Sequence, residues 1–421
     1  MPLSREQTEL VVLPPSGRYS CHRCGNCCSR YAVRIDKSTY ERLAAVDWSQ
    51  YGERFKGRPL FIPLDAAKEG IYSHELARVG ARCIFLEDDN RCLIHSVMGA
   101  DAKPLMCRKF PYNFVRTPEG VNVSLDLFCP SALGQKGEPI ENHLSEIRGL
   151  LTEVSEVATL PAEVALFLDQ TLNWRDYVEV ENALLALMLC EDATMEARLI
   201  AGTALILRVC QVQLQARMES QPVPPVARTL GELNVAELLA QAAKTPAAPL
   251  VHRLYLGVTL AAFESMAADV HGEKPLGFGA RVRLLCGSGR VKLWTLNGQE
   301  VSLNQLRKIS FDTAQTEIHT LMQRWLISKL ESRTVVPLTT LVRGWHHFVG
   351  HFIWARWFSR AMAWRRGSKV VECDDLFEGI QLTEMAARTL APQPGVKSFG
   401  KFLDLVYDSP KFVPAAVADG N

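Results

Sequence analysis

The chain has 421 residues, with 47 Lys and Arg against 46 Asp and Glu, and 48% of its residues are hydrophobic. This length predicts two or three domains, and the composition is typical of a soluble globular protein. A net charge near zero excludes a protein built around a strong field for nucleic acid, so we expect no nucleic-acid partner.

The sequence carries no recognisable targeting or membrane-spanning segment. The first ten residues, MPLSREQTEL, have neither a basic start nor an apolar core, so we expect no secretory signal. The longest apolar candidate, GWHHFVGHFIWARWFSR, carries three His and two Arg, whereas a spanning helix needs roughly 18 uncharged apolar residues. We therefore expect a cytoplasmic protein, in which thiols stay reduced and clustered cysteines favour a metal site over disulfides or a redox thiol pair.

Three regions are predicted along the chain, and the first covers residues 1–134. Its elements are short and are broken by Gly and Pro: a helix at 35–46, extended pieces at 60–65 and 81–87, and a turn followed by an alternating strand at 118–128. Such a region cannot assemble a large hydrophobic core. We expect a small α+β domain that a bound metal holds together.

The second region, residues 135–271, has helical periodicity. Apolar residues recur every three or four positions from Ile140 to Val154, and Asn173 is predicted to cap a helix over 174–190. A second helix is expected at 194–218. The prolines of 221–227 must then end this helical stretch, since each proline lacks an N–H donor and disfavours a helical conformation in the residue before it. Further helices are expected at 235–243 and 250–270.

The third region, residues 272–421, is predicted to pack on the helical domain. Residues 272–306 are expected to be irregular, except for a hairpin around Asn297-Gly298. Asp312 is predicted to cap a helix, and Pro337 separates it from a long aromatic helix at 338–366. A short helix follows 391–395. The predicted fold class is therefore mainly α, with a small cysteine-rich α+β domain and a minor β-hairpin. The face of the Asp312 helix is predicted to comprise Ile318, Leu321, Met322, Trp325 and Leu326.

Eight of the 12 cysteines lie in the first region, and they are the candidate metal ligands. They are Cys21, Cys24, Cys27, Cys28, Cys83, Cys92, Cys107 and Cys129. Thiolates suit zinc and iron–sulfur clusters. The C-x2-C-x2-C start matches part of a ferredoxin run and equally suits a tetrahedral zinc site, while the Cys-Pro pair at 129–130 lies far away. One four-ligand site with spare thiols and two sites both fit this pattern.

The surroundings of these cysteines favour bound thiolates. Gly25 and Asn26 allow a tight turn, and nearby cations offset the charge of gathered sulfurs. The predicted cations are Arg23, Arg30, Arg82, Arg91, Arg108 and Lys109. The four remaining cysteines lie in other parts of the chain and are predicted to be small buried hydrophobes: Cys190, Cys210, Cys286 and Cys373.

Three blocks, CHRCGNCC, CIFLEDDNRCLIH and PLMCRKFP, resemble in order the YkgJ-type cysteine-cluster family, described as zinc- or iron-chelating. The resemblance covers residues 19–130, with His95 where the family often has Tyr. Residues 173–205 and 345–359 resemble the flagellin lysine-N-methylase family. That resemblance implies a [4Fe-4S] cluster, with zinc as the alternative, and methyl transfer from S-adenosylmethionine to lysines of a flagellin-like protein substrate.

The residues themselves name no catalytic group. Gly287-Ser288-Gly289 is a poor cofactor loop, because alternating strand–helix units do not follow it, and no C-x3-C-x2-C triplet for radical chemistry occurs. An open iron position on the cluster would be another place for S-adenosylmethionine. His347 and His351, four residues apart, are expected to serve the core of an aromatic helix rather than a metal. The arginines of that helix are predicted to form a solvated face: Arg343, Arg356, Arg360, Arg365 and Arg366.

The main alternative to an enzyme is a non-catalytic zinc- or iron-binding module. Its helical half would then bind a partner, or the metal domain would transfer electrons or handle iron.

Overall fold

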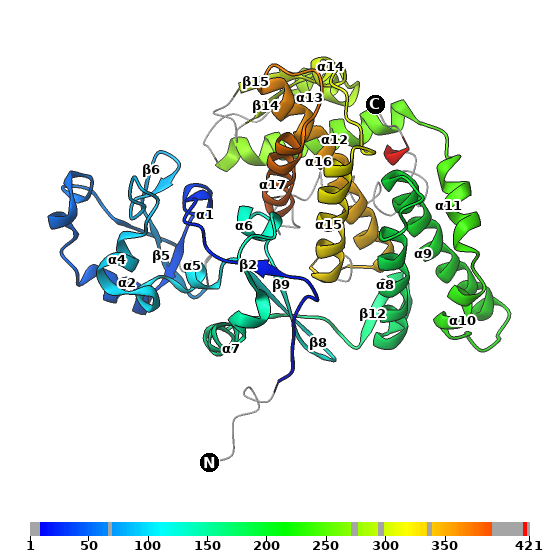
Figure 1. The fold of residues 1–421 in the computed structure, drawn as a ribbon, viewed down its shortest axis with the longest axis horizontal. Coiled ribbons are helices and arrows are strands. Elements are labelled where there is room, and N and C mark those ends of the chain that lie inside the picture. The colour runs from blue at the N-terminus through cyan, green and yellow to red at the C-terminus, as the bar shows by residue number, and fades with distance from the viewer. Residues whose placement is uncertain are drawn as a thin grey trace, which may run out of the picture. The chain divides into compact units, whose positions relative to one another are not determined.

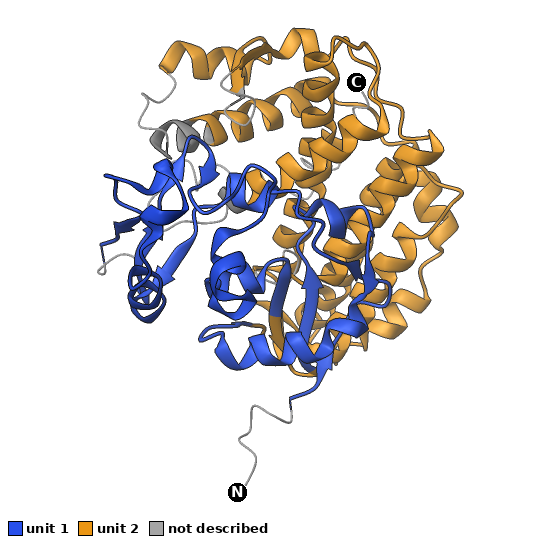
Figure 2. Ribbon diagram, turned by 60° about the vertical axis from the view of Figure 1, so that its left-hand side comes forward, with its two compact units in different colours: residues 1–114, 120–158 blue, residues 115–119, 159–421 orange. Residues whose placement is uncertain are grey.

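The computed structural model describes residues 9–65, 70–270, 277–293, 299–334, 339–389 and 416–418. It is 54% helix and 15% strand, which confirms the predicted mainly α fold with minor β structure (Figure 1). The chain separates into two compact units, Met1–Phe114 with Gly120–Ala158, and Val115–Glu119 with Thr159–Asn421 (Figure 2). The division into three regions stays a prediction.

The first unit consists of short elements. Its helices are α1 (Asn26–Arg30), α2 (Lys37–Ala44), α4 (Leu93–Met98), α5 (Leu105–Lys109), α6 (Pro130–Leu133) and α7 (Leu144–Glu153). Its strands are β1 (Val11–Val12), β2 (Arg18–Tyr19), β3 (Arg34–Asp36), β4 (Phe61–Pro63), β5 (Tyr72–Leu76), β6 (Arg78–Val79), β7 (Arg82–Cys83), the first half of β8 (Tyr112–Thr117), β9 (Gly120–Leu125) and β10 (Glu138–Pro139). The expected helix at 35–46 is α2, which begins where the Asp36 carboxylate accepts from the Thr39 N–H at 2.8 Å.

The sheets of the first unit are small. One runs in the order β1-β9-β8-β11, with β11 (Ala158–Thr159) at its edge, and another runs β3-β5-β4. The strand expected at 118–128 is β9, but all six of its residues are buried rather than every second one. Its polar residues Asn122 and Ser124 are buried as well, so both faces of this inner strand are covered.

Among the described residues of the first unit, buried hydrophobic side chains form two clusters. The first joins Ile35, Leu43, Trp48 and Phe85 from β3, α2 and the loops beyond. The second joins residues of β8, β9 and α7, including Tyr112, Val121 and Ile147. Each cluster is small, so hydrophobic burial in this unit is limited, as the sequence predicts.

The second unit is helical. Its helices are α8 (Trp174–Met188), α9 (Met195–Met218), α10 (Val226–Gly231), α11 (Val235–Ala243), α12 (Pro249–Val270), α13 (Phe278–Leu285), α14 (Leu303–Leu306), α15 (Thr316–Glu331), α16 (Leu341–Arg365) and α17 (Cys373–Thr389). Its hairpins are β12 (Glu163–Phe167) with β13 (Gln170–Asn173), and β14 (Arg290–Leu293) with β15 (Gln299–Ser302). Asn173 caps α8 as predicted, since its side-chain oxygen accepts from the Asp176 N–H at 2.9 Å.

Two expectations about this unit are wrong. Asp312 does not cap the next helix: its carboxylate accepts from the Ala314 N–H at 2.9 Å in the turn before it, and α15 begins only at Thr316. The stretch expected to be irregular contains α13 as well as the predicted hairpin strands. The Asn297-Gly298 turn, Pro337 and residues 391–395 lie outside the described residues.

The predicted solvated face of α16 is partly wrong as well. Arg356 and Arg360 are 4% and 6% exposed, because α16 is a central helix that is buried over most of its length. Arg356 pairs with Glu196 on α9 at 3.2 Å, and the Arg360 Nε donates to the Ile309 carbonyl at 3.0 Å. Of the other arginines in the predicted face, Arg343 is half-buried, and Arg365 and Arg366 at the C-terminal end of α16 are exposed.

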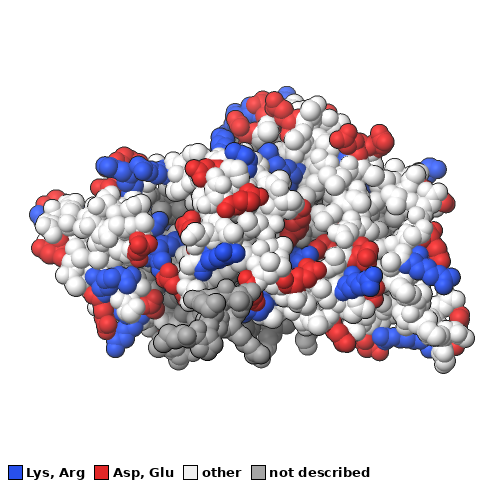
Figure 3. All heavy atoms as spheres, turned by 60° about the horizontal axis from the view of Figure 1, so that its bottom comes forward, with Lys and Arg blue, Asp and Glu red and all other residues white. Residues whose placement is uncertain are grey.

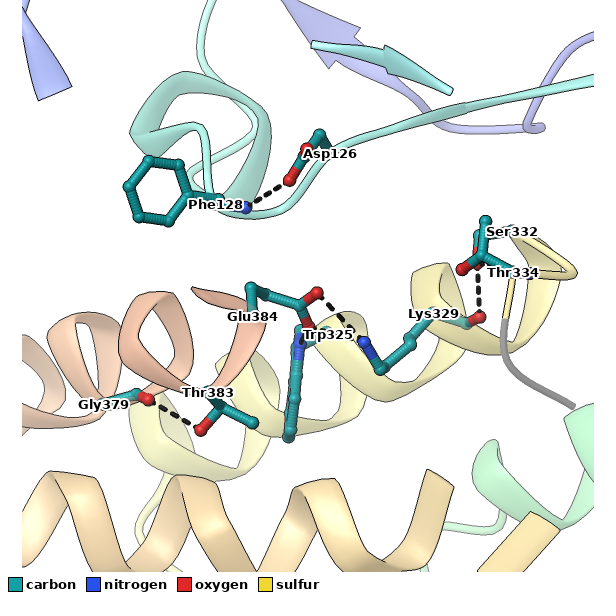
Figure 4. A network of polar contacts seen from close by, with 9 residues as sticks. All are labelled: Asp126, Phe128, Trp325, Lys329, Ser332, Thr334, Gly379, Thr383 and Glu384. Carbon is teal, nitrogen blue, oxygen red and sulfur yellow. Dashed lines mark hydrogen bonds and ion pairs between the residues drawn. The ribbon is translucent and has the colours of Figure 1, made fainter. Parts of the chain in front are cut away.

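A buried ion pair joins α15 to α17. The Lys329 Nζ lies 2.8 Å from one carboxylate oxygen of Glu384, and the Trp325 indole N–H donates to the same oxygen at 2.7 Å (Figure 4). Both charged side chains are nearly excluded from solvent. Such a pair specifies how two helices meet, since either charge alone would be costly to bury.

One helix of the described residues, α9, is long and apolar enough to cross a membrane by length and hydropathy, but 61% of that window is buried inside the protein. The core helix of a soluble protein passes the same test. On the face drawn in Figure 3, Lys and Arg side chains are interspersed with Asp and Glu, in keeping with the near-zero net charge.

Candidate metal centre

The segment that carries the first four cysteines contains a left-handed turn and a short helix. Gly25 has φ of 70° and precedes α1, and a Cβ at this position would lie 2.6 Å from the Asn90 side-chain oxygen. Only glycine therefore fits, as the sequence predicts. Cys21 and Cys24 before the turn are exposed, while Cys27 and Cys28 within α1 are half-buried.

Four cysteines from four separate segments pack against one hydrophobic cluster of the first unit. Cys83 is a buried member of the cluster around Phe85, and three partly buried cysteines pack against the same cluster: Cys28, Cys92 and Cys107. The isolated bridge between Leu86 and Cys92 closes the loop that separates the two cysteines of this block. We call Cys28, Cys83, Cys92 and Cys107 the cluster-side thiols.

Cys129 lies elsewhere in the unit, in the hydrophobic cluster of β8, β9 and α7. Its neighbours are tied to the first cysteine segment. The Ser131 hydroxyl lies 2.7 Å from the Ser20 carbonyl oxygen, and the Asn26 amide donates to the Phe128 carbonyl at 3.4 Å. The chain thus brings the segment of Cys21 to Cys27 beside Cys129, although a hundred residues separate them in sequence.

Cys27 stands between the two groups. Its sulfur lies 3.8 Å from that of Cys28, and this hydrogen bond, together with burial, raises the pKa of the Cys27 thiol far above its usual value. Burial is also the main reason that the pKa of Cys83 and of Cys129 rises to about 11, and the charge of Cys27 adds to both shifts. Burial likewise raises the pKa of Cys107, with further contributions from Cys83, Cys92 and Cys27.

These pKa shifts describe buried thiols, and repulsion between neighbouring thiolates adds to the effect of burial. A metal cation reverses that balance, because it stabilises each thiolate directly. These cysteines are therefore chemically suited to bind a metal as thiolates, and they lie close enough together to affect one another's pKa. In the part of the chain that the structure describes, no three His, Cys, Asp or Glu side chains form a group that could hold a metal ion. The eight-cysteine ligand set stays a prediction.

Several cations predicted to flank the thiols are engaged by other groups. Arg91 pairs with Asp89 at 2.6 Å, and the Arg108 guanidinium donates to Glu153 at 2.7 Å. Two cations that do affect these thiols were not among those predicted: Arg78 lowers the pKa of Cys83 and Lys103 lowers that of Cys107, each against the larger effect of burial. Arg78 also donates to the Ser29 carbonyl at 3.2 Å. Arg78 lies five residues before Cys83, and β6 folds back on β7 to bring them together.

The other candidate sites of the sequence take no part in this centre. Burial, followed by the charges of Lys329 and His347, lowers the pKa of His351 well below its usual value, so this imidazole is neutral in the helical unit. The Gly287 turn follows helix α13 rather than a strand, so it is no dinucleotide-type loop. Of the four cysteines expected in cores, Cys210 is buried, Cys190 and Cys373 are half-buried, and Cys286 is exposed, which contradicts that expectation.

Comparison with known proteins places a domain in this region. Residues 20–130 match the CxxCxxCC family model, described as a "putative zinc- or iron-chelating domain". This match agrees with the cysteine-cluster resemblance and covers all eight of the clustered cysteines. No curated protein and no solved structure gives a significant match to the chain, so the resemblance to the flagellin lysine-N-methylase family has no support beyond the residues that carry it.

Proposed function

We propose that residues 19–130 bind a [4Fe-4S] cluster through cysteine thiolates. The observation that carries this proposal is the packing of the four cluster-side thiols, from four separate segments, against one hydrophobic cluster. Thiolates are the usual ligands of iron–sulfur clusters, and apolar surroundings limit the access of water to them. The cluster would supply either electron transfer or an open iron position for a ligand.

The protein's own residues would shape that site. The Gly25 turn sets the direction of α1, and the Ser131 contact with Ser20 holds the first cysteine segment against α6. Arg78 offsets negative charge near Cys83. Binding energy from the centre would also stabilise a unit whose two hydrophobic clusters are small.

Zinc is the second candidate, because the matching domain is described as zinc- or iron-chelating. Eight thiols suit one or two closed zinc sites equally well in chemical terms. A zinc-bound protein would fit the alternative role, a non-catalytic module that binds a partner.

The absorption spectrum of anaerobically purified protein tests the cluster proposal. We expect a brown protein with a broad visible absorption band, which charge transfer from the sulfur ligands to iron produces. In Cys92→Ser, which removes a cluster-side thiol, the band should fall by more than half. An unchanged band in this variant would exclude Cys92 as a ligand.

We propose further that the metal-loaded protein is a methyltransferase that uses S-adenosylmethionine and acts on lysine side chains of a flagellin-like protein. What supports this is the resemblance of residues 173–205 to the flagellin lysine-N-methylase family. In the structure these residues are Asn173 at the end of β13, the helix α8 and the first part of α9. Calorimetric titration of S-adenosylmethionine into the metal-loaded protein tests it. Saturable binding is expected, and absence of heat at millimolar ligand would remove methyl transfer from consideration.

A further inference from the structure

A group of cations lies where α12, α13, the β14–β15 hairpin and the end of α14 pack together in the second unit. We call it the basic surface. Its members are Arg253, Arg281, Arg283, Arg290, Lys292, Arg307 and Lys308. Over residues 249–258, 277–293 and 299–309, all of which are described, Glu300 is the one acidic residue. This contrasts with the whole chain, in which acids and bases are equal in number to within one.

Two of these cations cover the same glycine. Gly287 has φ of +69° in the turn that ends α13, and a Cβ there would lie 3.0 Å from the Arg253 Cγ and would collide with the Arg307 guanidinium. Arg253 comes from α12, and Arg307 follows α14, so three elements converge at this turn. Glycine at 287 leaves room for both side chains.

The two arginines differ in their partners. The Arg307 Nη1 donates to the Asn304 side-chain oxygen at 3.1 Å, which orients its guanidinium. Arg253 is exposed, and among the described residues it has neither a hydrogen bond nor an ion pair. By contrast, Arg290 on the same surface pairs with Glu300 at 3.7 Å.

Arg253 and Arg307 bring two positive charges to one turn, and like charges repel each other. The C-terminal end of α13 carries a partial negative charge that offsets part of this repulsion, so an anion at the turn must be bound by the side chains against that dipole. Its last N–H groups are used within the turn, since Gly287 N–H bonds to the Leu284 carbonyl and Ser288 N–H to the Arg283 carbonyl. Side chains, and not a backbone nest, would therefore make the contacts to an anion.

From this geometry we propose that Arg253 and Arg307 bind a phosphate group over the Gly287 turn, either as free phosphate or as a phosphate ester. The planar guanidinium presents two parallel N–H groups that match two phosphate oxygens, which a lysine cannot do. The remaining cations of the basic surface raise the local concentration of the anion. This site lies in the helical unit and does not depend on the metal centre.

Calorimetric titration of inorganic phosphate and of glycerol 3-phosphate into the full chain, at constant ionic strength with chloride, tests the proposal. We expect saturable binding of at least one of them. Tighter binding of inorganic phosphate would indicate a site for free phosphate, and tighter binding of glycerol 3-phosphate would indicate a site for a phosphate ester. Arg253→Gln should weaken binding about tenfold, the effect of one charge-assisted hydrogen bond. Arg253→Lys should recover only part of that loss, because lysine restores the positive charge but not the two parallel N–H groups of the guanidinium.

Arg290→Gln is the matched control, since it removes a cation of the same surface that already has a carboxylate partner. It should change phosphate affinity by less than about twofold, because exposed pairs of this kind contribute little. Equal losses of phosphate affinity in Arg253→Gln and Arg290→Gln would overturn the proposal, because they would show that the summed charge of the basic surface attracts phosphate without a specific site. Failure of both phosphate compounds at millimolar concentration would overturn it too, and binding of a single-stranded oligonucleotide in their place would assign the surface to nucleic acid. Circular dichroism and thermal unfolding confirm that each variant is folded.

Discussion

At the scale of single residues, the eight clustered cysteines are not equivalent. Cys21 and Cys24 are exposed, whereas Cys83 and Cys129 are buried in two different hydrophobic clusters. Cys27 contacts Cys28 and influences thiols of both groups. Exposure matters for experiments, because serine at an exposed position removes a ligand without disturbing a core.

Cys24→Ser should therefore remove bound metal and lower the yield of soluble protein together. The side chain is exposed, so lost packing cannot explain such a result. Metal content by mass spectrometry and the soluble fraction after expression measure the two effects. Cys286→Ser is the control, since Cys286 is equally exposed but lies in the second unit, and it should change neither quantity. Full metal content in Cys24→Ser would show that Cys24 is not a ligand.

At the scale of elements, the local signals of the sequence predicted most helices of the second unit. The Asn173 cap and the α15 face from Ile318 to Leu326 are read from neighbours three or four positions apart, and the structure confirms both. The failure at the predicted solvated face of α16 depends on partners distant in sequence. Arg356 and Arg360 look like a solvated face until Glu196 and the Ile309 carbonyl are placed beside them.

The ion pair between α15 and α17 should carry a large cost when it is broken. Lys329→Met leaves the Glu384 carboxylate buried without its cation, which should destabilise the protein by about 3–5 kcal/mol in denaturant unfolding. Lys329→Met with Glu384→Leu should recover most of this loss, since neither charge is then left buried. If Lys329→Met lowers the unfolding free energy by less than about 1 kcal/mol, the Glu384 carboxylate must be hydrated or protonated in this variant.

The crossing of α9 and α16 should depend on Gly202. A Cβ at this position would collide with the Trp345 indole ring, so Gly202→Ala should cost about 1–3 kcal/mol of unfolding free energy. Gly149→Ala in α7 is the matched control, because a Cβ there meets nothing within 4 Å. It should stabilise by about 0.5–1 kcal/mol, the usual helix preference of Ala over Gly. A stabilising Gly202→Ala would mean that α9 and α16 do not approach as closely as described.

At the scale of the whole molecule, the chain combines a unit of short elements and small clusters with a helical unit of larger core. The sequence located the cysteine-bearing region and its eight thiols, since spacing and composition are local properties. It could not predict that Cys28, Cys83, Cys92 and Cys107 share one hydrophobic cluster while Cys129 belongs to another. That partition depends on β9 and the Ser131 to Ser20 contact, which join distant segments.

Metal removal should affect the two units unequally. In chelator-treated protein, limited proteolysis should cut within residues 9–114 and 120–158 and leave the helices of the second unit intact, because only the first unit relies on the bound centre for folding energy. Mass spectrometry of the fragments locates the cuts. Equal protection of the first unit with and without metal would show that its two hydrophobic clusters suffice.

The iron and acid-labile sulfide content of anaerobically purified protein tests the central claim most directly. A [4Fe-4S] centre held by the clustered cysteines predicts about four iron and four sulfide per chain, or about eight of each if both thiol groups bind a cluster. Colourless protein with stoichiometric zinc and no sulfide would contradict the iron–sulfur centre and leave a zinc-binding domain in its place.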